Sequence, residues 1–80
     1  MRLDKYLKVS RIIKRRTVAN EACDAGRVKI NDKVSKASVD VKVGDVISIQ
    51  FGDKITTLEV LVVKETVRKE DAVTMYKMVE

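Results

Sequence analysis

Histidine and proline are absent from this 80-residue chain, and Cys23 is its single cysteine. With no histidine and one cysteine, the chain cannot assemble a tetrahedral zinc site of the Cys/His kind by itself. Ser-His-Asp and Cys-His nucleophile systems are excluded for the same reason. A lone cysteine forms no intrachain disulfide, which is typical of a reducing cytoplasm. We therefore expect a cytoplasmic protein without a metal centre, with Cys23 as a small core residue.

Long apolar runs are also missing. The longest covers residues 60–63, whereas a helix needs about 20 apolar residues to span a bilayer. Met1 is followed by Arg2 and Asp4 rather than by an apolar segment, so no secretion signal is expected. The carboxylates are scattered, and the glycines are too isolated for a phosphate-binding loop. The sequence therefore predicts a protein that is not an enzyme, uses no cofactor and does not span a membrane.

Aromatic residues are scarce, and the chain has Tyr6, Phe51 and Tyr76. Phe51 alternates with apolar positions and is expected to be buried. Tyr6 is expected in the core with its hydroxyl at the rim. This small set offers no platform on which unpaired bases stack. If RNA is the partner, we expect recognition of structured RNA through its backbone and shape.

Positive charge is abundant but confined to one half of the chain. The net charge is +5, and residues 1–36 hold 11 Lys or Arg against 4 Asp or Glu, a net +7. Residues 37–80 hold 6 basic and 8 acidic residues, a net −2. Such asymmetry favours a polyanionic partner, and at this point RNA, DNA and an anionic membrane all remain open.

Two short helices are predicted in the basic half. Apolar positions recur with helical spacing over residues 3–8, and residues 10–14 break the period. A second helix is expected over 17–25, with Thr17 as its N-cap and Gly26 as its left-handed C-cap. The expected apolar face of this helix consists of Val18, Ala22 and Ala25, with Ala19 and Cys23 beside them.

Period-two alternation follows the helices and predicts strands. Residues 28–30 and 33–34 form an expected hairpin around Asn31-Asp32. Residues 46–51 and 54–63 form a second antiparallel pair, whereas 39–43 fits either a strand or an extended loop. The tail fits a short helix over 72–79 or a closing strand at Met78. The predicted architecture is α+β, with two N-terminal helices packed on a small, mainly antiparallel sheet.

Three groups of cations are candidates for binding a polyanion. The first is Lys14-Arg15-Arg16-Thr17, at a predicted helix start where cations are unfavourable unless an anion lies among them. The second recurs every three residues along the first helix and contains no acidic residue, since Asp4 is out of phase. The third follows Gly26 on the first hairpin. For each group, an ordinary solvated surface is the alternative. The second group is Arg2, Lys5, Lys8 and Arg11. The third group is Arg27, Lys29, Lys33 and Lys36.

Four ordered segments resemble the RNA-binding domain named after small-subunit ribosomal protein four. They are Arg2-Leu3-Asp4-Lys5-Tyr6-Leu7, Arg16-Thr17-x-Ala19, Gly26-Arg27-Val28-x-Ile30-Asn31 and Val41-x-x-Gly44-Asp45. The resemblance implies the alpha-L RNA-binding motif over residues 1–51, with 52–80 as an extension packed on it. It also implies RNA contact by Arg16 and Thr17, with Lys14 and Arg15 as extra cations and Arg2 and Lys5 alongside.

The short chain and the stretch over residues 9–17 are similar to the stand-alone RqcP group, related to the fifteen-kilodalton heat-shock protein. That resemblance implies binding to large ribosomal subunits obstructed by peptidyl-tRNA, with contacts to large-subunit rRNA and the tRNA. It implies support for alanine tailing of the nascent chain by a partner factor, and a monomer off the ribosome. The family resemblance also favours RNA over DNA as the partner and implies no membrane partner. Asp32 and Val43 depart from the Gly and Pro common in the family.

Two other functions fit the same sequence. A generic structured-RNA binder, such as an assembly factor or an mRNA regulator, needs the same basic surface. A protein–protein adaptor would use that surface to bind an acidic partner.

Overall fold

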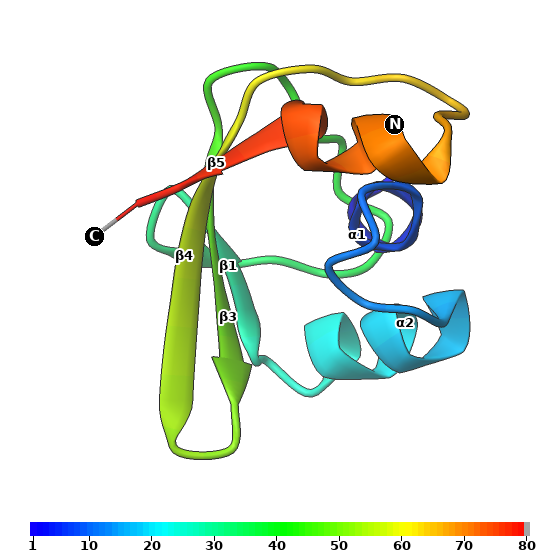
Figure 1. Ribbon diagram of the computed structural model, residues 1–80. Helices are drawn as coiled ribbons and strands as arrows, with labels where there is room; N and C mark the ends of the chain where they lie inside the picture. The colour runs from blue at the N-terminus through cyan, green and yellow to red at the C-terminus, as the bar shows by residue number, and fades with distance from the viewer. Residues whose placement is uncertain (80) are drawn as a thin grey trace.

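The computed structural model describes residues 1–79, which form an antiparallel sheet with three helices on one face (Figure 1). Glu80, the last residue of the predicted extension, lies outside the described residues. The helices are α1 (Leu3–Val9), α2 (Arg16–Asp24) and the 3-10 helix η1 (Lys69–Met75). The strands are β1 (Val28–Ile30), β2 (Lys33–Val34), β3 (Val46–Phe51), β4 (Lys54–Val60) and β5 (Tyr76–Met78). The predicted α+β class is confirmed.

The strands lie in the order β2-β1-β3-β4-β5, and every neighbouring pair is antiparallel. The β1–β2 turn places Asn31 and Asp32 at φ angles of 50° and 68°. Two successive positive φ angles are those of a type I′ hairpin turn, which Asn and Asp tolerate better than most residues. The predicted hairpin around this pair is therefore confirmed.

The core lies between the helices and one face of the sheet. Alternation puts every second strand residue on this face, because successive side chains point to opposite sides of a strand. Lys29 and Ser48 consequently lie on the other face, which we call the outer face. The buried strand residues include Val28, Ile47, Ile49, Leu58 and Val60, and the buried helix residues include Leu3, Tyr6, Leu7, Ala19, Cys23 and Met75.

Helix α2 differs from its prediction in start and in phase. It begins at Arg16 with Arg15 as the N-cap residue, so Thr17 lies inside the first turn and the predicted Thr17 cap is wrong. Ala19 and Cys23 are buried, whereas Val18 is 47% exposed. The small side chains at the buried positions let α2 approach α1, and this contact sets the phase of the helix. The C-cap residue is Ala25, and the predicted left-handed glycine follows it, with Gly26 at φ +78°.

Phe51 is 44% exposed, so its predicted burial is wrong. It is the last residue of β3 and pairs with Lys54 beside the Gly52-Asp53 turn. The β3–β4 hairpin extends beyond α2 at this end of the sheet, so the helices do not cover its tip (Figure 1). Alternation identified the correct face of the strand, but the length of the helical layer decides burial.

The tail contains both structures that the sequence left open, since η1 leads directly into β5. Tyr6 Oη donates a 2.8 Å hydrogen bond to the carbonyl oxygen of Met75. Tyr6 is fully buried, so the expectation that its hydroxyl lies at the rim is wrong. The contact packs η1 over α1. Residues 39–43 form a loop whose single β-bridge joins Asp40 to Arg2 in the described chain. Through residue 79, no helix is long and apolar enough to cross a membrane.

Candidate nucleic-acid interface

A hollow of about 350 Å³ opens between α1, the start of α2 and residues 65–67. We call it the basic hollow, because cations from three places in the chain line it. Residues 65–67 also line it and contribute one carboxylate. The cations are Lys5, Lys8, Arg11 and Arg16, and the remaining lining residues are Val9, Glu65, Thr66 and Val67.

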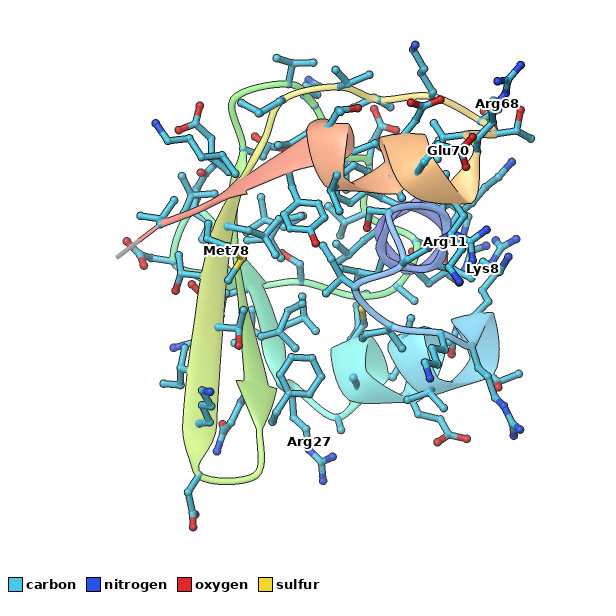
Figure 2. All side chains as sticks on the ribbon, in the orientation of Figure 1. Lys8, Arg11, Arg27, Arg68, Glu70 and Met78 are labelled. Carbon is cyan, nitrogen blue, oxygen red and sulfur yellow. The ribbon has the colours of Figure 1, made fainter. Side chains whose placement is uncertain are left out.

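The cations of helix α1 lie toward the hollow because the other face of the helix packs in the core. Leu3, Tyr6 and Leu7 are fully buried. Lys5 and Lys8, three residues apart, share the side left to solvent. Figure 2 shows Lys8 and Arg11 close together at the end of α1, on the side turned away from the sheet. Of the predicted strip, Lys5, Lys8 and Arg11 line the hollow, whereas Arg2 is hydrogen-bonded to Asp4 and is not among the lining residues.

Asp4 is a buried carboxylate that joins two of the candidate arginines. Its Oδ1 accepts a 3.2 Å hydrogen bond from Arg2 Nε, and its Oδ2 accepts one of 3.4 Å from Arg16 Nε. Asn20 Nδ2 donates to Oδ2 at 3.2 Å, and the backbone N–H of Lys5 donates to Oδ1 at 2.8 Å. Both arginine side chains remain about half exposed, at 50% and 48%. The Asp4 carboxylate thus binds both arginines from the protein interior, while their outer sides face solvent.

The protonation of Asp4 reflects two opposing effects. Burial raises its pKa, but the hydrogen bonds from Asn20, Arg16 and the Lys5 amide together lower it below the ordinary value. The carboxylate is therefore ionised at neutral pH and pairs with both arginines. Sequence spacing gave Asp4 no role, because it is out of phase with the basic strip. Its burial between two helices is a tertiary feature that this spacing does not show.

The other predicted cations near α2 are exposed in the loop before it. Lys14 and Arg15 precede the helix, and Thr17 lies exposed in its first turn. Thr17, Arg16 and Asn20 line a second hollow that borders Asp4. Glu21 also lines this hollow, so it contains a carboxylate beside the cation of Arg16.

The structure separates the four remaining candidates from the basic hollow. Arg27 and Lys29 line a different hollow of about 230 Å³, together with residues of the outer face such as Gln50 and Ile55. Figure 2 places Arg27 far from Lys8 and Arg11. The last two are exposed on β2 and in the loop after it: Lys33 and Lys36. The twelve candidates therefore do not form one surface.

The segment after β4 contributes a wall that the sequence did not predict. Lys5 Nζ pairs with the Glu65 carboxylate across 60 positions of sequence. The hydrogen bond from Lys5 lowers the pKa of Glu65. Residues 37–80 are acidic on balance. The structure shows that they also border the basic surface.

Cys23 is fully buried, and burial raises the pKa of its thiol to about 11. A thiol that stays protonated is a poor nucleophile and a poor metal ligand, which agrees with its predicted role in the core. Within residues 1–79, no group of three or more cysteine and acidic side chains is placed to hold a metal ion.

This chain is similar to known proteins in both sequence and fold. The S4 domain model matches residues 1–47. A protein of Halalkalibacterium halodurans named RQC P-site tRNA stabilizing factor is 58% identical over 78 residues, covering 98% of this chain and 89% of that protein. Its namesake in Streptococcus pneumoniae is 56% identical over 79 residues, covering 99% and 90%. The trimeric structure of Vibrio cholerae heat shock protein 15 superposes with a TM-score of 0.91 at 28% identity, covering 99% of this chain and 81% of that one.

Proposed function

The chain belongs to the family of RQC P-site tRNA stabilizing factors and carries the S4 domain, and we propose that it holds tRNA on obstructed large ribosomal subunits. Membership makes it an RNA-binding protein of ribosome quality control rather than an enzyme. The finer part of the proposal is that it contacts both large-subunit rRNA and peptidyl-tRNA. In this way it supports C-terminal alanine tailing of the nascent chain by a partner factor on the same particle.

The observation that supports this proposal is the clustering of cations around the basic hollow. Lys8, Arg11 and Arg16 reach it from a helix, a turn and a second helix. Asp4 fixes the orientation of Arg16 from the buried side. Fixed cations on a rigid helix pair suit a structured polyanion, because phosphate contacts set register and orientation.

The mechanism is stabilisation by binding. Lys and Arg side chains neutralise phosphates and release the counterions condensed on RNA, which supplies the affinity. A protein that touches rRNA and tRNA together favours the tRNA position in which both contacts are made. Holding that position between successive additions would let tailing continue without the small subunit. The chain itself performs no covalent step in this scheme.

Removal of the central cations tests the site. We expect Arg2→Ala and Arg16→Ala to weaken co-sedimentation with large subunits that carry peptidyl-tRNA. Lys8→Ala is the cleaner third variant, because its side chain is exposed and is not bound to Asp4. Lys54→Ala removes the same charge at the tip of the β3–β4 hairpin and is the matched control. Association at the wild-type level by all three variants would rule out this surface.

The nature of the bound RNA separates rescue from the generic alternative. Pull-down followed by RNA sequencing should recover tRNA and large-subunit rRNA together. Recovery of mRNA alone would instead support a regulatory RNA binder. RNase treatment tests the adaptor alternative, since a complex held only by protein contacts survives it.

A further inference from the structure

Arg11 has a backbone conformation that arginine rarely adopts. Its φ angle is +62°, in the left-handed region. The Cβ of an L-residue is crowded there, and glycine alone enters the region freely. The other described non-glycine residues with positive φ are Asn31 and Asp32, whose side chains are among the best tolerated in this conformation. Arg11 therefore stands out as an unfavourable residue for its position.

The end of α1 requires this conformation. The Arg11 N–H donates to the Lys8 carbonyl at 3.1 Å, and the Ile13 N–H donates to the Leu7 carbonyl at 3.1 Å. These bonds satisfy carbonyls that the last turn of a helix leaves without partners. The chain must turn left-handed at position 11 to make them, and a glycine is the residue that usually serves this purpose. The backbone thus has no need of a long side chain here.

The Arg11 side chain is exposed and lines the basic hollow. Lys8 lies beside it, as Figure 2 shows, and Arg16 lines the same hollow from α2. Arg16 is paired with Asp4, but within residues 1–79 no ion pair neutralises Lys8 or Arg11. Repulsion between these two cations is unfavourable for folding and is relieved when an anion lies between them. The side chain therefore fits badly with both the backbone and its charged neighbours in the free protein.

We propose that Arg11 is a phosphate-contacting residue kept at the expense of fold stability, and that the basic hollow receives one backbone phosphate of the bound RNA. This rests on the proposed function. Lys8, Arg11 and Arg16 surround the phosphate on one side, and residues 65–67 close the other. In the free protein Lys5 is paired with the Glu65 carboxylate. Lys8, Arg11 and Arg16 are therefore the cations that meet the phosphate first, and RNA must compete with Glu65 for Lys5.

Stability and binding are expected to change in opposite directions in Arg11→Gly. We expect a higher midpoint of urea unfolding, because the backbone strain and the charge repulsion are both removed. We expect weaker binding to a tRNA transcript and to large subunits carrying peptidyl-tRNA. The slope of log affinity against log salt should become shallower by about one, as for the loss of one phosphate contact. Arg11→Lys should keep most of the affinity and leave the unfolding midpoint unchanged.

Asp32→Gly is the matched control, since it relieves the same kind of strain in the β1–β2 turn. It should raise the unfolding midpoint without weakening either interaction. An Arg11→Gly variant that binds the tRNA transcript and the large subunits as well as the wild type does would overturn the proposal. A lower urea-unfolding midpoint of Arg11→Gly than of the wild type would also overturn it. If the wild type binds the tRNA transcript but not the large subunits, the proposed function fails. The phosphate site is then still tested by the binding of Arg11→Gly to the tRNA transcript.

Discussion

Asp4 connects the core of the protein to its basic surface. Its side chain is almost fully buried, yet it accepts hydrogen bonds from Arg2 and Arg16, whose outer sides face solvent. A buried charge is tolerated when several donors surround it. The carboxylate therefore does two things, since it ties α1 to α2 and it limits the directions in which two candidate RNA contacts can point.

We predict that Asp4→Asn lowers the free energy of unfolding at pH 7 by about 2 kcal/mol, the usual size for loss of hydrogen bonds to a buried charge. The folded-state pKa of Asp4 lies below its ordinary value of 3.8. The ionised group therefore stabilises the fold above pH 3.8, and the contribution disappears as the pH falls through the folded pKa. Urea unfolding at several pH values measures the difference between variant and wild type.

The control for this prediction is Asp53→Asn in the exposed turn between β3 and β4, which should leave stability unchanged. A constant difference between Asp4→Asn and wild type from pH 7 down to pH 2 would contradict the assigned role of the charge.

Sequence reasoning at the residue scale succeeded where one element decides the outcome. The left-handed Gly26 and the Asn31-Asp32 turn follow from local backbone preferences, and the structure confirms both. It failed where two elements meet. The role of Asp4 depends on donors from α2, and the exposure of Phe51 depends on how far that helix extends over the sheet.

Helix α1 has seven residues, which is too short for a stable helix on its own. Its position depends on contacts made by the rest of the chain. The hydrogen bond from Tyr6 to Met75 attaches it to η1, and the bridge between Arg2 and Asp40 attaches it to a loop. The basic side chains of α1 are therefore oriented in part by the tail. The sequence predicted the helix but not these attachments.

Tyr6→Phe tests the attachment between α1 and η1. Removing the hydroxyl deletes one of three hydrogen bonds to the buried Met75 carbonyl, which keeps the Leu61 and Val62 N–H groups as donors. We therefore predict a loss of about 1 kcal/mol in the free energy of unfolding, the usual net size of one hydrogen bond. Chemical denaturation measures it. Tyr76→Phe is the control, because the described chain, up to residue 79, contains no hydrogen bond from that hydroxyl. Equal stability of Tyr6→Phe and wild type would show that the tail does not hold α1.

The segment between β4 and η1 places Glu65 against Lys5. Bound RNA competes with this carboxylate for the lysine. We predict that Glu65→Gln raises RNA affinity by a few-fold at most, because exposed ion pairs are weak and screened by salt. Glu70→Gln, in η1, removes the same charge outside the lining of the basic hollow and is the control. Weaker RNA binding by Glu65→Gln would contradict this competition.

Charge on the whole molecule is divided between two sides of the sheet. The helical side carries the basic hollow and the loop cations before α2, whereas the outer face mixes basic, polar, acidic and apolar side chains. The net charge of +5 suggested a polyanion but no direction of approach. Its concentration in residues 1–36 was visible in the sequence. The separation of Lys29 from the basic hollow was not, because it depends on which face of the sheet the side chain occupies.

Salt dependence tests this division of charge. Each phosphate contact contributes about −0.9 to the slope of log affinity against log salt for a duplex. We predict a slope steeper than about −4 for structured RNA, since most of the helical-side cations would contact phosphates. Lys29→Ala and Lys77→Ala, on the outer face, should leave the slope unchanged, whereas Lys8→Ala should make it shallower. The reverse ranking would place the RNA on the outer face.

The central claim is that the helical side faces RNA on an obstructed large subunit. A cryo-EM reconstruction of the protein on large subunits that carry peptidyl-tRNA tests it most directly. We predict rRNA and tRNA phosphates beside Lys8, Arg11 and Arg16, with Lys29 and the rest of the outer face turned away from both RNAs. A reconstruction with the outer face against RNA and the basic hollow open to solvent would contradict the claim.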